Sequence, residues 1–301
     1  MIGIVGSTAS GKSALGMALA QHLQGAIISA DAYALYRGMD IGTAKPSAQD
    51  RAQVPHYQID VLDIHEVASV AAYQQYARAD ADVIEAGGQV PIAVGGSGLY
   101  VRALFDQMHF PGTDSRVRER LQAEADELGS AAMHARLAAA DPQAAQRLHP
   151  NNARRIVRAL EVIELTGQPF SATLPKEEFA RPSVLIGVRR ENDDVDQRIT
   201  ARTKQMFQTG WVEEVRSLMR RGFAATPTAV RATGYRAVMD LIDGELTLQE
   251  TVDAVCLQTR QLVRRQVKWF RKDPRIHWLN ATEMSQDQLV DQALRIIRKM
   301  R

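Results

Sequence analysis

The residues with the clearest chemical meaning lie near the start of the sequence. The eight residues from position 6 read GSTASGKS and match G-x-x-x-x-G-K-[ST], between a strand predicted at Ile2–Val5 and a helix predicted at Lys12–His22. Glycines let backbone N–H groups surround an anion, and the helix N-terminus adds partial positive charge. The motif predicts phosphate binding without saying which phosphate compound is bound. The predicted phosphate-binding residues are Gly6, Ser7, Thr8, Ala9, Ser10, Gly11, Lys12 and Ser13.

Two side chains of this motif carry most of its chemistry. Lys12 supplies a full positive charge to a terminal phosphate, and the Ser13 hydroxyl can ligate Mg²⁺. We therefore predict Mg²⁺ as the cofactor, with Ser13 as its protein ligand.

An acidic residue follows the next predicted strand. A P-loop protein that hydrolyses ATP usually has an Asp at the end of a second apolar strand, but the candidate strand Val90–Val94 is followed by Gly95-Gly96-Ser97-Gly98. Asp31 instead follows the predicted strand Ala26–Ser29. Because the carboxyl ends of parallel strands surround the ligand crevice, we expect Asp31 close to the anion held by Lys12. The alternative is that Asp31 only caps a helix.

The elements that position these residues form an α/β pattern. Residues 1–113 alternate short β-branched runs with helical stretches, which predicts a parallel sheet covered by helices. From 114 to 166 the strand signal disappears and about three helices are expected, the last between the capping residue Asn152 and Gly167. Residues 167–301 are predicted to complete the core and to add basic C-terminal helices. Further strands are expected at Gln58–Val61, Ser183–Val188 and Ile276–Leu279, and further helices at Ser69–Glu85, Asp194–Arg221, Arg236–Leu241 and Leu248–Arg271.

Composition limits the class of protein. Of the 301 residues 45% are apolar and 24% charged, and no stretch approaches the roughly 20 apolar residues that a membrane span needs. No secretory signal pattern is visible. The single cysteine, Cys256, excludes an intramolecular disulfide and a cysteine-based zinc site, and we expect it to be buried. These features predict a cytoplasmic protein.

Basic residues are concentrated in two segments although the net charge is only +2. Seven basic residues and one acid lie between Arg260 and Arg275, and four arginines and a histidine lie between Arg147 and Arg158 without an acid. This clustering indicates a polyanion that contacts particular surfaces, although a solvated helix face is the alternative. In the predicted C-terminal helix, the spacing i, i+4, i+8, i+11 places four cations on one face: Arg260, Arg264, Lys268 and Arg271.

These motifs together resemble the tRNA dimethylallyltransferase family. The resemblance implies a P-loop NTPase-like core with a helical insertion. It also implies transfer of a dimethylallyl group from dimethylallyl diphosphate to N6 of the tRNA adenosine 3′-adjacent to the anticodon. The matching segments occur in the same order over nearly the whole chain: Gly6–Ser13, Asp31–Pro46, Val94–Tyr100, Asn152–Glu161, Arg231–Arg236 and Arg264–Arg271.

The resemblance implies a role for individual residues. Asp31 would be the general base at N6, and Arg231 would help the P-loop hold the diphosphate. Ser97 takes the place of a threonine that contacts the substrate, while Ala32 and Tyr33 differ from the small or polar residues usual after the acid. The implied contacts to the tRNA anticodon stem-loop are Asp31, Ala32, Tyr33, Ala34, Ser97, Arg118, Arg154, Arg155, Arg158, Gly234, Tyr235, Arg236, Arg264, Arg265, Gln266, Lys268 and Arg271.

Other functions share parts of this pattern. A small-molecule phosphotransferase would share Lys12 and Ser13, and an isopentenyltransferase acting on free adenine nucleotides would share the reaction. A regulatory GTPase-like module would need an N-K-x-D-like segment, which we do not find. We expect Trp211 and Phe270 to pack in the interior, and we expect a monomer without a membrane partner.

Overall fold

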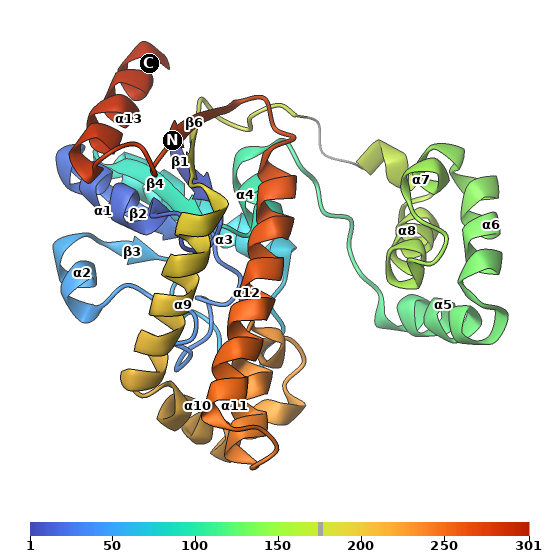
Figure 1. Cartoon of the computed structure of the whole chain (residues 1–301). Coiled ribbons are helices and arrows are strands. Elements are labelled where there is room, and N and C mark those ends of the chain that lie inside the picture. Colours follow the sequence, from blue (N-terminus) through green and yellow to red (C-terminus); the bar gives the residue numbers. More distant parts are fainter. Residues whose placement is uncertain (174–176, 301) are drawn as a thin grey trace. The chain divides into compact units, whose positions relative to one another are not determined.

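A parallel sheet of six strands forms the centre of the larger of two units in a computed structural model, which describes residues 1–173 and 177–300 (Figure 1). The larger unit comprises residues 1–105 and 181–301, and the smaller unit comprises residues 106–180. The strand order is β3-β2-β4-β1-β5-β6. The strands are β1 (Ile2–Gly6), β2 (Gly25–Ser29), β3 (His56–Tyr57), β4 (Val90–Gly95), β5 (Val184–Arg189) and β6 (Ile276–Asn280).

One predicted strand is wrong. The chain forms β3 at His56–Tyr57, and the expected strand at Gln58–Val61 is absent. Gln58 and Asp60 have φ angles of 57° and 58°, which a strand does not allow. The other five expected strands coincide with β1, β2, β4, β5 and β6 to within two residues.

Helices connect the strands and extend the larger unit. The expected helix Asp194–Arg221 is divided in two, because Gly210 has a φ of 100° and ends the regular path of the chain. The helices of this unit are α1 (Lys12–His22), α2 (Ala48–Gln53), α3 (Val70–Ala86), α4 (Gly98–Phe105), α9 (Asn192–Gln208), α10 (Trp211–Arg220), α11 (Tyr235–Ile242), α12 (Leu248–Phe270) and α13 (Gln286–Met300).

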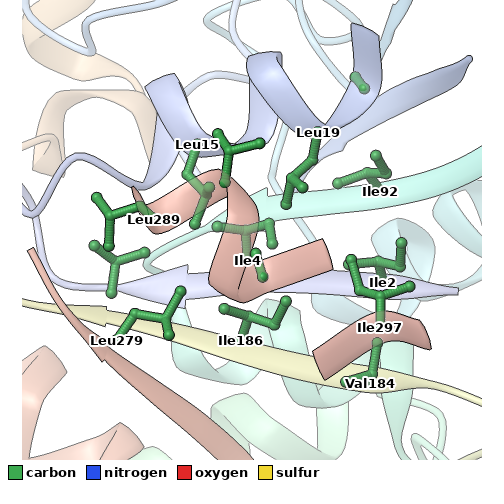
Figure 2. Close-up of a cluster of buried hydrophobic side chains, with 14 of the residues drawn as sticks. Ile2, Ile4, Leu15, Leu19, Ile92, Val184, Ile186, Leu279, Leu289 and Ile297 are labelled. Atoms are coloured by element: carbon green, nitrogen blue, oxygen red, sulfur yellow. The ribbon is translucent and has the colours of Figure 1, made fainter. Parts of the chain in front are cut away.

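Apolar side chains cover both faces of the sheet. Ile2, Ile4 and Ile186 point to one face and meet Leu15 of α1 and Leu289 of α13 in a buried cluster (Figure 2). Successive strand residues point to opposite faces, so Gly3 faces the other side. There the Phe105 ring of α4 lies against its backbone, and an added Cβ would approach that ring to 2.7 Å. Both faces of the parallel sheet are therefore buried, as such sheets require.

The topology brings four loops to one edge of the sheet. Strands β2, β4, β1 and β5 are neighbours and run parallel. Their carboxyl ends lead to Asp31, to Gly95–Gly98, to the phosphate-binding motif and to Arg190, respectively. This edge is where a ligand crevice is expected in an open α/β sheet.

The smaller unit is helical. The expected insertion at 114–166 lies inside it, and the unit extends further in both directions. The predicted cap is present, since the side chain of Asn152 accepts a hydrogen bond from the N–H of Arg155, and Gly167 ends the same helix with a φ of 67°. Its helices are α5 (Ser115–Leu128), α6 (Ser130–Ala140), α7 (Pro142–Arg147), α8 (Ala153–Thr166) and the short 3₁₀ turn η1 (Phe170–Thr173).

Two expectations about the interior are confirmed. Cys256 is buried, and so are Trp211 and Phe270. Among the described residues, no helix is both long enough and apolar enough to cross a membrane.

Candidate active site

The phosphate-binding motif forms the loop between β1 and α1. Gly11 precedes α1 with a φ of 99°, a left-handed conformation that glycine adopts without strain. Two arginines hold the loop through its carbonyl groups. Arg190 Nε donates to the carbonyl of Ser10 at 2.9 Å, and Arg198 Nε donates to that of Ala9 at 3.1 Å. These two bonds anchor the loop at Ala9 and Ser10.

Asp31 lies at the end of β2 in a defined orientation. Its Oδ1 accepts a hydrogen bond from the N–H of Tyr33 at 2.9 Å, and its own N–H donates to Ser29 Oγ at 3.4 Å. The hydroxyl of Ser97 accepts from the N–H of Ala32 at 3.2 Å. Ser97 thus supports the backbone next to Asp31, and this is a structural use for the hydroxyl predicted to contact the substrate.

A cavity of roughly 490 Å³ joins these loops. Lys12, Ser13 and Asp31 line it together with Arg202 from α9. The remaining wall is mostly apolar and comes from both sequence halves of the larger unit. Its apolar residues include Met17, Ile27, Ile199, Met206, Trp211, Val255 and Leu262. The cavity therefore has a charged end suited to an anion and walls suited to a hydrocarbon.

The charges in the cavity act on one another. Burial lowers the pKa of Lys12 to about 8; the carboxylate of Asp31 opposes this, and the Arg202 guanidinium adds to it. Burial also lowers the pKa of Arg202, which Asp31 again opposes. The charged residues that line the cavity are Lys12, Lys45, Arg202, Asp31 and Asp50, so cations exceed carboxylates by one, which favours an anion such as diphosphate.

Arg202 is the residue that sequence reasoning missed. The family resemblance implies that Arg231 helps to hold the diphosphate, but Arg231 is exposed and is not part of the cavity wall. Its backbone carbonyl accepts a hydrogen bond from the Tyr33 hydroxyl at 3.0 Å. Arg202 lies four residues after Arg198, on the face of α9 that contacts the motif loop, but the spacing acquires this meaning only through the long-range contact of Arg198 with that loop.

The segment that follows Asp31 is held by a buried cation and an acid. The Lys45 side chain is 1% exposed; its ammonium donates to Asp40 Oδ1 at 2.8 Å and contacts Asp60 Oδ1 at 2.5 Å. Glu214 of α10 accepts from the N–H groups of Asp40, Ile41 and Gly42 at 2.7, 2.6 and 3.3 Å. The cavity wall formed by residues 42–46 is therefore fixed by tertiary contacts.

Several residues predicted to contact tRNA have an interior role. Tyr235 is fully buried, and its hydroxyl donates to Glu214 Oε1 at 2.7 Å. Gly234 and Ala34 are buried as well, and Arg236 is exposed with its Nε bonded to Asp240 at 2.9 Å. Gln266 is 9% exposed and points inward. Ala34, Gly234, Tyr235 and Gln266 face the interior, which the linear motif does not reveal, whereas Arg236 stays at the surface and is paired within its own helix.

The outer face of α12 keeps the expected cations. Arg264, Arg265, Lys268 and Arg271 are exposed. Arg260 differs, because its guanidinium lies 3.2 Å from Asp196 Oδ1 of α9. The basic face thus begins one turn later than predicted.

In the smaller unit, the predicted arginines divide into two pairs. Arg118 and Arg158 both bind the fully buried carboxylate of Glu161, at 2.7 and 2.9 Å. Burial opposes ionisation of Glu161, but the two arginines keep its pKa below the usual value. Arg154 and Arg155 are exposed at the start of α8. Of these four arginines, only Arg154 and Arg155 form no ion pair with Glu161.

The donor atoms of the cavity suit Mg²⁺ better than a metal ion whose ligands all come from protein side chains. The described residues contain no group of three or more His, Cys, Asp or Glu side chains that could hold a metal ion. Mg²⁺ usually takes one or two protein oxygens and completes its shell with water and phosphate. The Ser13 hydroxyl, which lines the cavity beside Lys12, would supply one such oxygen.

Comparisons with known proteins agree with this geometry. Residues 34–273 match the family described as IPP transferase. A tRNA dimethylallyltransferase from Nocardioides sp. is 48% identical over 298 residues, covering 99% of this chain and 95% of the relative. A relative of the same description from Salinispora arenicola is 51% identical, covering 99% and 86%.

Solved structures give the same result. The full-length tRNA isopentenylpyrophosphate transferase of Bacillus halodurans superimposes with a TM-score of 0.74 at 36% identity, covering 99% of this chain and 95% of the other. A eukaryotic dimethylallyltransferase acting on tRNA superimposes with a TM-score of 0.82 at 25% identity, covering 99% and 78%. With a matching family profile, near-complete relatives and a shared P-loop α/β fold, this chain belongs to the IPP transferase family.

Proposed function

We propose that this chain transfers a dimethylallyl group from dimethylallyl diphosphate to tRNA, at N6 of the adenosine 3′-adjacent to the anticodon, and releases diphosphate. The observation that carries the proposal is the meeting of Lys12, Arg202 and Asp31 in one cavity with apolar walls. Relatives that cover nearly the whole chain are tRNA dimethylallyltransferases, and one similar structure is of an enzyme acting on tRNA.

Different regions of the cavity would hold the diphosphate, the five-carbon chain and the target adenine. The loop N–H groups, Lys12 and Arg202 would hold the diphosphate, and side chains such as Met206 and Leu262 would surround the five-carbon chain. Asp31 interacts electrostatically with both Lys12 and Tyr33, so an adenine beside Asp31 would also be close to the diphosphate. The target adenine must leave its stack to reach this point, as bases do in enzymes that modify them.

The chemical step is a substitution at carbon 1 of the dimethylallyl group. The bond from this carbon to the diphosphate oxygen breaks, the electron pair leaves with the diphosphate, and the N6 lone pair forms the new C–N bond. The proton of N6 passes to the Asp31 carboxylate. Lys12 and Arg202 stabilise the charge that develops on the leaving group, and such preorganised electrostatics is usually the largest catalytic contribution.

Magnesium belongs to the same proposal. Ser13 would be its protein ligand, and the cation would neutralise part of the diphosphate charge. Lys12 and Arg202 supply positive charge from the protein side and orient the same anion. We expect no further metal.

The tRNA would lie along exposed cations. Arg264, Arg265 and Lys268 on α12, Arg271 directly after it, and Arg154 and Arg155 on α8 remain available for the anticodon stem-loop. Phosphate contacts of this kind position the RNA, while the cavity selects the base. We expect the protein to act as a monomer in the cytoplasm, where its tRNA substrate would be found.

The proposal is tested by incubating the pure protein with Mg²⁺, radiolabelled dimethylallyl diphosphate and unmodified tRNA. We expect label on the adenosine beside the anticodon, and with Asp31→Asn a loss of turnover of about 10²–10⁴-fold, the usual contribution of general base catalysis. Affinity for tRNA should stay within a few-fold. Asp291→Asn is the matched control, because Asp291 is exposed on α13.

Two outcomes would count against this proposal. Phosphate transfer from ATP to a small molecule, without label on tRNA, would favour a phosphotransferase. Equal turnover of AMP and tRNA would favour an enzyme of free nucleotides. Unchanged turnover of Asp31→Asn would leave the reaction intact but remove Asp31 as its base.

A further inference from the structure

We propose that Gln266 is a positioning residue that couples tRNA binding on α12 to diphosphate binding at the P-loop. The inference rests on the proposed function, and it assigns to Gln266 a role other than contact with RNA. Its amide lies inside the protein, between two loops of the site, while its helix neighbours Arg265 and Lys268 are exposed.

The amide of Gln266 uses its acceptor and its donor in different directions. Oε1 accepts a hydrogen bond from the N–H of Thr8 at 2.8 Å, and Nε2 donates to the carbonyl of Gly96 at 3.1 Å. No other uncharged side chain of this length supplies both groups. The fit is close, because a Cβ added at Gly96 would lie 2.6 Å from Nε2. A side chain at position 96 would therefore displace the amide from this position.

The two hydrogen bonds connect Gln266 to two different loops of the active site. Thr8 belongs to the loop that leads into Lys12 and Ser13 at the start of α1. Gly96 directly precedes Ser97, whose hydroxyl supports the N–H of Ala32 beside Asp31. One side chain thus connects the anion-binding loop to the loop that orients the general base.

The same helix is fixed to the second loop at a further point. The indole of Trp269 lies against Gly98, where an added Cβ would approach it to 2.2 Å. Trp269 is 39% exposed, so its outer edge remains at the surface close to the exposed cation Lys268. A helix that is held by RNA on its outer face therefore also holds both loops on its inner face.

This arrangement predicts positive coupling between the two substrates. RNA that restrains α12 also restrains Thr8 and Gly96. When diphosphate then binds, the entropic cost of ordering these residues is smaller. By thermodynamic linkage, diphosphate must then strengthen tRNA binding by the same factor. Gln266 is the connection, so its loss should remove the coupling while each substrate still binds alone.

The test measures the dissociation constant of inorganic pyrophosphate with Mg²⁺, with and without saturating unmodified tRNA, on the full chain. In the parent we expect tRNA to tighten pyrophosphate binding at least about fivefold, the lower end of typical allosteric coupling. Gln266→Leu keeps the side-chain bulk and loses both bonds, so the factor should fall to near one with each binary dissociation constant within about threefold. Gln266→Glu keeps the acceptor for Thr8 only and should be intermediate. Gln261→Leu is the matched control, because Gln261 is exposed on the same helix.

The outcomes separate this inference from the function on which it rests. An unchanged pyrophosphate affinity with tRNA bound to the parent would overturn the coupling and leave the function standing. Parent-like coupling in Gln266→Leu would overturn the role of Gln266. If Gln266→Leu does not fold, the coupling factor of Gln266→Glu is used instead. A factor equal to that of the parent would then overturn the role of Gln266, and a reduced factor would support it. A parent that binds no tRNA would refute the proposed function, and the inference with it.

Discussion

Three charged residues from three separate segments make the reactive end of the cavity. Lys12 follows β1, Asp31 follows β2, and Arg202 lies in the second half of α9. The first two could be predicted, because a motif fixes the local backbone and the sheet topology fixes where the strand ends meet. Arg202 could not, because its place depends on how α9 packs against the motif loop through Arg198, which is a long-range contact.

The first prediction compares Arg202 and Arg231, the two arginines considered for binding the diphosphate. Arg202→Met should weaken binding of Mg²⁺-pyrophosphate by about 10- to 100-fold, since a hydrogen bond to a charged group contributes about 1.5–3 kcal/mol. Arg231→Met, at an exposed position outside the cavity wall, should change the affinity less than threefold. Titration calorimetry of both variants measures the difference. A larger loss in Arg231→Met would return the diphosphate role to Arg231.

Single elements show where local patterns stop being sufficient. Apolar runs predict five of the strands, and the caps of α8 are visible in the sequence. The expected strand at Gln58–Val61 fails because Asp60 turns toward Lys45 and Arg51. These ion pairs join the segment after Asp31 to the segment after β3. A contact between two such distant segments has no signal in a local pattern.

The second prediction concerns the stability of this joined segment. Burial opposes ionisation of Asp60, but bonds from Lys45 and Arg51 outweigh it and hold its pKa below the usual 3.8. Because the folded pKa is lower than the unfolded one, the stabilisation is complete above about pH 4 and is lost as the pH falls through the folded value. Asp60→Asn should therefore lower the free energy of unfolding by about 1–3 kcal/mol at pH 7.

Urea unfolding at pH 7, 5, 4 and 3 measures this effect. The difference between parent and Asp60→Asn should shrink toward the acidic end, because protonation removes the same charge from the parent. Asp291→Asn, at an exposed position on α13, should follow the parent at each pH. A constant difference over the whole range would show that Asp60 contributes through packing and not through its charge.

At the scale of the whole molecule, pairing decides which basic residues remain for RNA. The net charge of +2 conceals a division between paired and exposed cations. Arg260 and Arg275 pair with Asp196 and Asp273, and Arg118 and Arg158 bind Glu161. The sequence predicts the basic segments but does not separate these groups, because Asp196 and Glu161 lie on other elements or on the next turn, and only Asp273 is close in sequence to the arginine that it binds.

The third prediction follows from this division. Each phosphate neutralised by a protein cation releases counterions, so the logarithm of affinity falls linearly with the logarithm of salt concentration. Arg264→Glu with Lys268→Glu removes two exposed cations from α12 and should reduce this slope for tRNA by between about 1 and 2. Arg295→Glu with Arg298→Glu makes the same charge change on the exposed side of α13 and is the matched control. Filter binding at several salt concentrations gives both slopes. If the salt dependence of tRNA affinity falls equally in both double variants, the RNA responds to net charge alone. If it falls only in the α12 double variant, the RNA binds to that face of α12.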